Sequence, residues 1–176
     1  MEIVTTQVRH ADLLADYYQR NQIRFARWHP LVRDDHHSIK AWKARLRDRE
    51  LDYNDGRAAH FIGLDAGKVV GACSLTSITY SPAYHCQLGY SIDSDYEGRG
   101  VMTRIVRHVV QYAFENLKMN RVCANYMPAN ERSARLLGKL GFEKEGYAKK
   151  YLCINGKWED HVLTSLINPA GTDPNW

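Results

Sequence analysis

A short glycine-containing segment lies between a predicted strand and a predicted long helix. It runs from 96 to 103 and reads Tyr-Glu-Gly-Arg-Gly-Val-Met-Thr. Glycine at 98 and 100 removes two Cβ atoms, so a phosphate group can approach the backbone closely. The first amides of the following helix have no partner within the helix, and the positive end of the helix dipole strengthens their attraction for an anion. The segment therefore predicts a pyrophosphate-binding turn formed by Gly98, Arg99, Gly100, Val101, Met102 and Thr103.

This segment differs from two well-known phosphate motifs. No Gly-Lys-Ser/Thr follows it, as in a Walker loop, and the third glycine of a dinucleotide fingerprint is missing. An ordinary glycine-rich connection is the alternative interpretation.

A pair of polar residues stands at the start of another predicted helix. Asn130 and Ser133 are three positions apart and share one face of the first helical turn. A helix start needs only one of them as a cap. The second predicts a ligand that runs past the helix start. The alternative is a purely structural hydroxyl at Ser133, bonded to the Asn130 carbonyl.

The spacing of apolar residues predicts the elements that position these two segments. Alternation over 84–93 predicts a half-buried strand, and the apolar face over 101–117 predicts a long helix. A strand over 121–127 ends at a proline, and the helix after Asn130 ends at Gly141.

The first part of the chain is predicted to be mainly helical. A strand over 3–8 precedes a helix over 11–20, and the segment 25–30 interrupts the helix because Pro30 disfavours helix at the residue before it. Ser38 is expected to cap a second helix. The apolar stripe of that helix is Ile39, Trp42 and Leu46, and its arginines Arg45, Arg47 and Arg49 are expected on a solvated face.

Two hairpins complete the predicted sheet. Strands over 60–64 and 69–78 are joined by a glycine-containing turn, and strands over 146–154 and 157–167 are joined by Asn155-Gly156. The order of elements predicts an α/β (α+β) fold, with a mixed, mostly antiparallel sheet of about seven strands and about four helices on both faces. At 176 residues the chain is predicted to form one domain over 1–168, with a flexible tail over 169–176.

Composition excludes several classes of protein. The hydrophobic share of 44% and the charged share of 25% exclude a disordered protein, and a net charge of +4 is too small to predict a nucleic-acid partner. No apolar run reaches the roughly 18 residues of a membrane span, and charged residues interrupt any signal peptide. The four cysteines form no C-x-x-C pair and indicate a reducing compartment. We therefore expect a cytoplasmic protein, and the histidine spacing predicts no metal site.

Together the two polar segments resemble the GNAT superfamily of acetyl-CoA-dependent N-acetyltransferases, whose hallmark is Q/R-x-x-G-x-G/A followed by an N-x-x-S/A helix that ends in G-F. The likeness covers nearly the whole chain. The segments 25–30, 124–128, 140–148 and 158–161 are similar to RimJ-type ribosomal-protein-alanine N-acetyltransferases.

The chain departs from the superfamily pattern at four positions. Glu97 replaces Gln or Arg and is expected to point outward, and Met102 replaces Gly or Ala. Leu137 stands where many relatives carry a tyrosine that protonates the leaving thiolate. Asn125 replaces a glutamate that some relatives use. The resemblance therefore leaves the general base unassigned.

The resemblance implies direct acetyl transfer from acetyl-CoA to a protein N-terminus, with no covalent intermediate on the enzyme. The implied acceptor is the N-terminal alanine of a small-subunit ribosomal protein, with no metal and no direct nucleic-acid or membrane partner. Two alternatives stay open: acetylation of a small-molecule amine, and a non-catalytic module that binds CoA or the ribosome. The oligomeric state is left open.

The resemblance also implies roles for single residues. Catalytic roles fall to Ser133, as the acid for the leaving thiolate, and to Tyr90. Cofactor contacts are expected from Asn130, Ser133 and the end of the central strand, at Ser91, Ile92 and Asp93, in addition to the glycine turn. Acceptor contacts are expected from Trp28, His29 and Tyr126.

Overall fold

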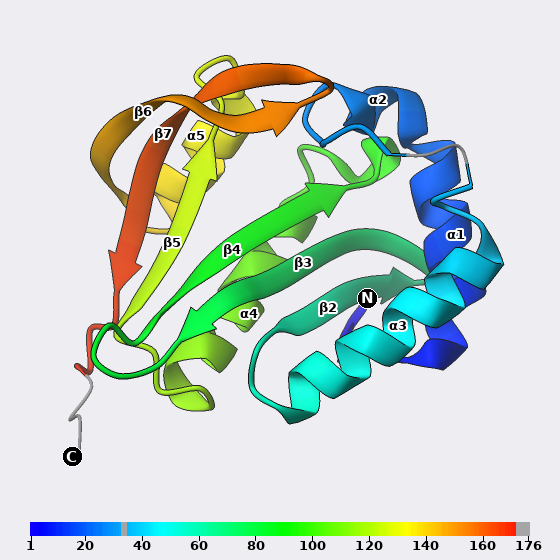
Figure 1. The fold of residues 1–176 in the computed structure, drawn as a ribbon, viewed down its shortest axis with the longest axis horizontal. Coiled ribbons are helices and arrows are strands. Elements are labelled where there is room, and N and C mark those ends of the chain that lie inside the picture. The colour runs from blue at the N-terminus through cyan, green and yellow to red at the C-terminus, as the bar shows by residue number, and fades with distance from the viewer. Residues whose placement is uncertain (33–34, 172–176) are drawn as a thin grey trace.

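The computed structural model describes residues 1–32 and 35–171, so the predicted tail falls outside the described residues from 172 onward. These residues form a seven-stranded sheet in the order β1-β2-β3-β4-β5-β7-β6 (Figure 1). Its strands are β1 (Glu2–Thr5), β2 (Ala59–Asp65), β3 (Lys68–Thr79), β4 (His85–Ile92), β5 (Arg121–Tyr126), β6 (Glu143–Ile154) and β7 (Lys157–Ile167). Within this part of the chain, only β4 and β5 pair in parallel. The predicted mixed, mostly antiparallel sheet is confirmed.

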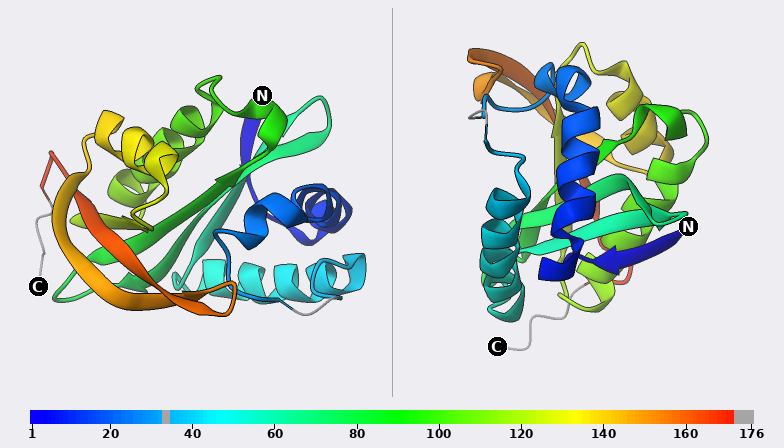
Figure 2. Two further views of the ribbon diagram at one scale, coloured as in Figure 1. Left: turned by 90° about the horizontal axis from the view of Figure 1, so that it is seen from above. Right: turned by 90° about the vertical axis from the view of Figure 1, so that its right-hand side faces the viewer.

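Helices cover both faces of this sheet (Figure 2). The described residues contain five α-helices: α1 (Ala11–Arg20), α2 (Gln22–Ala26), α3 (Ile39–Asn54), α4 (Val101–Glu115) and α5 (Glu131–Lys139). Helices α4 and α5 pack on one face, and α1 and α3 pack on the other. Short 3-10 turns precede α1 and follow β4, at Val8–His10 and Ser94–Tyr96.

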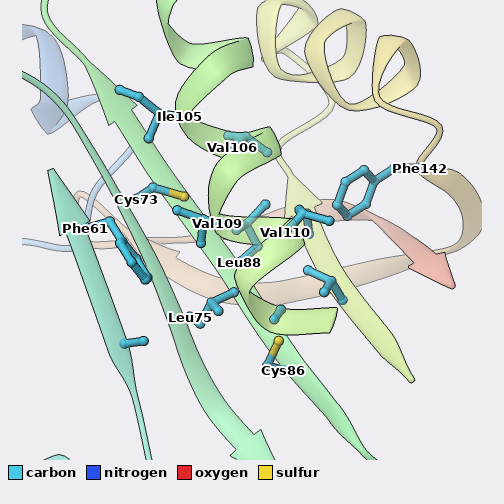
Figure 3. Close-up of a cluster of buried hydrophobic side chains, with 14 of the residues drawn as sticks. Phe61, Cys73, Leu75, Cys86, Leu88, Ile105, Val106, Val109, Val110 and Phe142 are labelled. Atoms are coloured by element: carbon cyan, nitrogen blue, oxygen red, sulfur yellow. The ribbon is translucent and has the colours of Figure 1, made fainter. Parts of the chain in front are cut away.

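The larger core lies between α4 and the sheet. Figure 3 shows the apolar face of α4 directed at side chains of β2, β3 and β4. The α4 residues Ile105, Val106 and Val109 are fully buried there, as the 3.6-residue period predicts. Each such side chain stabilises the fold by roughly 1.5–3 kcal/mol. This packing fixes the start of α4 relative to the end of β4.

The second core joins α1 and α3 to the opposite face of the sheet. Ser38 caps α3 as predicted, because its hydroxyl accepts a hydrogen bond from the amide of Ala41 at 3.1 Å. Trp42 and Leu46 are buried as predicted, with 1% and 0% of their surface exposed. Ile39, however, is 46% exposed, so its predicted place in the buried stripe is wrong. The first turn of α3 extends beyond the surface that the sheet offers.

The predicted solvated face of α3 is only partly correct. Arg47 is exposed. The guanidinium groups of Arg45 and Arg49 instead lie over the Trp42 ring, at 4.2 and 5.2 Å from its centre. Their long side chains fold back along the helix because a cation is attracted to the face of an indole ring.

Two boundaries near the N-terminus also differ from the prediction. Strand β1 ends at Thr5 rather than at residue 8, because the Val8 amide donates to the Glu50 carboxylate of α3 at 2.9 Å instead of to a strand. Helix α2 was not predicted as a separate element. It begins after Asn21, and the chain leaves helical geometry only beyond Ala26, before Pro30.

The turn between β6 and β7 and the end of α5 are formed as the sequence predicts. Asn155 and Gly156, with φ of 45° and 78°, join β6 and β7 as the predicted hairpin turn. At the end of α5, Gly141 donates to the carbonyl of Gly138 and Phe142 donates to that of Leu137. This is the Schellman arrangement that terminates many helices at a glycine. The predicted helix stop at Gly141 is therefore confirmed.

Candidate active site

The centre of the sheet opens between β4 and β5. Their parallel pairing covers only His85 to Gln87 and Arg121 to Cys123, yet both strands continue beyond these residues. Figure 1 shows the two strands separating toward the end that α2 and the tip of the β6–β7 hairpin approach. The second half of β4 thus has a main-chain edge that β5 does not pair with.

Two residues of β4 direct their main-chain groups into this opening. The amide of Asp93 donates to the carbonyl of Val70 in β3 at 2.9 Å. In an antiparallel pair the direction of the main-chain groups alternates. Tyr90 and Ile92 therefore present their amide and carbonyl groups on the side away from β3. An extended ligand can pair with this edge as a strand would.

Because of the same alternation, the main-chain groups of Ser91 and Asp93 are not directed into the opening, where the sequence predicted that they contact the cofactor. The groups of Ser91 and Asp93 face β3, and the Ser91 hydroxyl hydrogen-bonds to the hydroxyl of Tyr17 at 2.9 Å. Asp93 is 4% exposed, and its carboxylate accepts from Arg20 at 2.8 Å and from Asn21 at 3.1 Å. Asp93 therefore holds the turn after β4 in place and has no free group for a ligand.

The glycine turn leads directly into α4. Gly98 and Gly100 have φ of +70° and +74°, which glycine adopts without strain. A Cβ at either position would meet no atom within 4 Å, so the space above the turn is open. The first amide donor within the helix is that of Arg104, which bonds to the Gly100 carbonyl at 3.1 Å. The amides of residues 101–103 thus have no helical partner and lie at the positive end of α4.

The side chains of this turn offer fewer groups for binding an anion than its backbone does. Met102 is 5% exposed and packs into the core against β3. The Arg99 guanidinium lies 5.7 Å from the centre of the Tyr96 ring. An anion in the open space would therefore be held mainly by main-chain amides, as the sequence predicts. Contacts of Arg99 with phosphate stay a prediction.

Glu97 does not point outward, and that prediction is wrong. Its carboxylate forms ion pairs with Arg24 of α2 and Arg132 of α5, and its side chain is 24% exposed. Arg24 also donates to the carbonyl of Ile92. Glu97 and Arg24 therefore connect α2, the end of β4 and α5 beside the opening. The sequence carried no signal for Arg24, because it is one of many charged residues on short helical segments.

Asn130 and Ser133 meet the opening from α5. The Asn130 side-chain oxygen accepts from the Ser133 amide at 3.1 Å and caps the helix. The Ser133 hydroxyl lies 2.5 Å from the hydroxyl of Tyr90 in β4. Its hydrogen-bond partner is therefore Tyr90 and not the Asn130 carbonyl. The structure thus brings the two predicted catalytic residues into direct contact.

The environment of Tyr90 determines which form of its hydroxyl is present. Burial raises the pKa of Tyr90 to about 12, although the hydrogen bond with Ser133 opposes this shift. The phenol is therefore protonated at neutral pH. In this form the Tyr90–Ser133 pair has a proton with which to hydrogen-bond an anion in the opening.

The predicted acceptor residues do not come together. Tyr126 packs against the core on the α4 face of the sheet. His29 lies on the opposite side, with its ring 5.0 Å from that of Phe25, and burial lowers its pKa. Trp28 stands next to it, beneath the Arg27 guanidinium at 4.7 Å. Of the three predicted acceptor residues, only Trp28 and His29 therefore lie next to each other.

A polar cluster that the sequence did not predict joins β4, β5, β6 and β7. The Asn125 side chain donates to Tyr151 at 3.3 Å and to Gln87 at 3.5 Å, and accepts from the Thr164 amide at 3.3 Å. These partners come from strands far apart in the sequence, which explains why spacing gave no signal. The cluster contains no carboxylate, so Asn125 does not replace the missing glutamate as a base.

An unpaired strand edge beside a helix start with free amides has room and hydrogen-bond donors for a long phosphorylated cofactor. Comparison with known proteins agrees with a cofactor of this kind. The acetyltransferase (GNAT) domain family matches residues 3–143. The chain belongs to the GNAT acetyltransferase family, whose members use acetyl-CoA.

Three relatives illustrate the similarity. The chain is 41% identical over 168 residues to the [ribosomal protein uS5]-alanine N-acetyltransferase of Escherichia coli, covering 93% of this chain and 86% of that protein. The crystal structure of the ribosomal-protein-S5-alanine acetyltransferase from Vibrio fischeri superposes with a TM-score of 0.94 at 38% identity, over 97% of this chain and 94% of that one. RimJ of Mycobacterium smegmatis in complex with CoA-disulfide shares the fold, with a TM-score of 0.90 at 23% identity over 96% and 82% of the two chains.

In the part of the chain that the structure describes, no helix combines the length and the apolar character needed to cross a membrane.

Proposed function

We propose that this enzyme transfers the acetyl group of acetyl-CoA to the N-terminal alanine of ribosomal protein uS5. The observation that carries the proposal is the 41% identity, over 93% of the chain, to the uS5-alanine N-acetyltransferase of E. coli. The open edge of β4 beside the start of α4 supports the use of acetyl-CoA. A ribosomal-protein acceptor would place the reaction in the cytoplasm.

The main chain supplies most of the cofactor contacts in this proposal. The amides of residues 101–103 bind the pyrophosphate, and those of Tyr90 and Ile92 pair with the pantetheine arm in the opening. These donors are fixed by the packing of α4 and β4 before any ligand arrives. Such preorganised donors also stabilise the charge that develops on the acetyl carbonyl oxygen during attack by the amine.

The Tyr90–Ser133 pair acts on the leaving sulfur. Because burial raises the pKa of Tyr90 to about 12, the pair keeps its protons at neutral pH and donates a hydrogen bond to the departing thiolate. The pair takes the place of the tyrosine that Leu137 replaces, since Leu137 is 1% exposed and buried in the core.

The acceptor amine needs little help to lose its proton. The reference pKa of an N-terminal amine is about 7.7–8.0, so roughly a tenth is neutral at pH 7. After the neutral amine attacks, its nitrogen must lose one further proton, and a water held by the polar cluster around Asn125 accepts this proton and passes it to solvent. A strong base, which that cluster does not contain, is therefore not required.

The test is incubation of the enzyme with acetyl-CoA and a peptide that has the N-terminal sequence of uS5, beginning with alanine. Mass spectrometry is expected to find one acetyl group on the α-amine. The control is the same peptide with its α-amine blocked, which leaves only lysine side chains as acceptors, and spermidine serves as a small-molecule acceptor. Acetylation of the blocked peptide or of spermidine alone would contradict the proposal, and so would CoA binding without transfer.

A further inference from the structure

A cavity of about 360 Å³ lies on the face of the sheet opposite to α4. Its walls come from α1, α2, α3, residues 29–32 and 36–37, and the turn between β6 and β7. The amide of Asn155 in that turn donates to the His29 carbonyl at 3.0 Å and closes one side. This size is at the lower end of the range for ligand-binding pockets, roughly 300–1,000 Å³.

Two arginines give this cavity a positive wall. The guanidinium groups of Arg45 and Arg49 are held over the Trp42 ring, and Arg45 also donates to the His36 carbonyl at 2.8 Å. Over residues 1–32 and 35–171, no carboxylate lies within 4.0 Å of either group. Burial lowers the pKa of both arginines, because the fold shields their positive charge from water. Such charge is unfavourable unless an anion compensates it.

Two further polar atoms at this cavity have no hydrogen-bond partner among the described residues. They are Nε1 of Trp42, whose side chain is 1% exposed, and Nδ1 of His37. An indole N–H can only donate, and a buried polar group without a partner costs about 1–3 kcal/mol. A ligand that accepts hydrogen bonds would satisfy the indole and compensate the arginines together.

Helix α1 links the wall of the cavity to the strand that borders the opening. Tyr18 on its wall follows Tyr17, whose hydroxyl hydrogen-bonds to Ser91 at 2.9 Å. Ser91 stands in β4 between Tyr90 and Ile92, which border the opening. At the rim of the cavity Leu31 and Val32 are 68% and 42% exposed and offer an apolar surface. A polypeptide whose first residue enters the opening from this face can therefore extend across the cavity.

We propose that this cavity binds a carboxylate side chain of the acceptor polypeptide, within a few residues of the N-terminus that is acetylated. The planar guanidinium groups suit a carboxylate because each can donate two parallel hydrogen bonds. The Trp42 indole N–H is a third donor group, beside the two guanidinium groups. This inference rests on the proposed function and adds a specificity determinant to it.

The experiment compares matched pairs of peptides that begin with alanine and differ only by Glu or Gln at one of positions 2 to 6. The wild-type enzyme is expected to acetylate one Glu peptide about tenfold better in kcat/KM than its Gln partner, mainly through KM, since a charged hydrogen bond contributes about that much. In Arg49→Gln the preference is lost. The matched control is Arg47→Gln, which removes an exposed arginine of the same helix and keeps the preference.

Equal rates with Glu and Gln at every position of the wild-type enzyme would overturn the inference. This comparison needs no variant, so it remains decisive if Arg49→Gln does not fold. Loss of the preference in Arg47→Gln as well would also overturn it, because a general charge effect would then explain the result. Acetylation of the α-amine in these same reactions separates the two proposals: its presence without a Glu preference leaves the proposed function standing, and its absence removes both.

Discussion

At the scale of single residues, the contact between Tyr90 and Ser133 joins two elements that the sequence separates by 43 positions. Spacing identified Ser133 as a polar residue beyond the needs of a helix cap. It could not show that the hydroxyl of Ser133 meets the hydroxyl of Tyr90. Because the two hydroxyls share one hydrogen bond, they are expected to act as a unit.

We predict that Ser133→Ala and Tyr90→Phe each lower kcat about tenfold and change the KM for acetyl-CoA little, because each removes part of one donor to the leaving thiolate. The double variant is expected to lose no more than about tenfold, as residues that act together are not additive. Steady-state kinetics with the alanine peptide measures all three. Tyr80→Phe removes a hydroxyl of a half-exposed tyrosine before β4 and serves as the control. A hundredfold loss in the double variant, as independent residues would give, would contradict the shared role.

At the scale of elements, the main chain at the start of α4 is expected to contribute more to CoA binding than any side chain near it. The first turn of α4 is held against the sheet by the core on the α4 face, and the carboxylate of Asp93 fixes the end of β4 to Arg20 of α1. The sequence predicted this turn correctly as an element junction. It did not show Glu97 paired with Arg24 and Arg132, since these partners lie on other helices.

We expect Gly100→Val to reduce CoA affinity at least about tenfold, because a branched side chain would occupy the open space where the phosphates approach the backbone. Isothermal titration calorimetry measures this affinity. The matched control is Gly67→Val in the turn between β2 and β3, where φ is +75° and a Cβ also meets no atom within 4 Å. Both variants should lose about 1–2 kcal/mol of unfolding free energy from backbone strain. Equal CoA affinity in the two variants would place the phosphates elsewhere.

At the scale of the whole molecule, a half-buried imidazole in β2 makes the stability of the fold sensitive to pH. The Nδ1 atom of His60 lies 2.8 Å from the Ser74 hydroxyl of β3. Burial lowers the pKa of His60 to about 3, and the positive charge of Arg49 adds to the effect. The folded protein therefore keeps His60 neutral at pH values where the unfolded chain binds a proton.

The direction of the pH dependence follows from this difference. The pKa of His60 in the folded protein is below the unfolded value of about 6.5, so the full stabilisation is present above that value and is lost as the pH falls toward 3. Between about pH 7.5 and about pH 5 we predict a loss of about 2 kcal/mol in unfolding free energy from this group. Urea denaturation at the two pH values measures it. In His60→Gln the loss should shrink by that amount, whereas the exposed control His108→Gln should retain it. An unchanged pH dependence in His60→Gln would refute the assignment.

The sequence by itself determined the order of the strands and of every helix except α2, the helix caps at Ser38 and Asn130, the hairpin turn at Asn155-Gly156 and the glycine turn before α4. These features depend on local backbone geometry and on the spacing of apolar residues, both of which are written in consecutive positions. Only the tertiary structure decided which β4 groups face the opening, that Ser133 meets Tyr90, and that Arg45 and Arg49 line a cavity instead of a solvated surface. Strand pairing and long side chains bring together residues that are distant in the chain, and no spacing rule encodes those contacts.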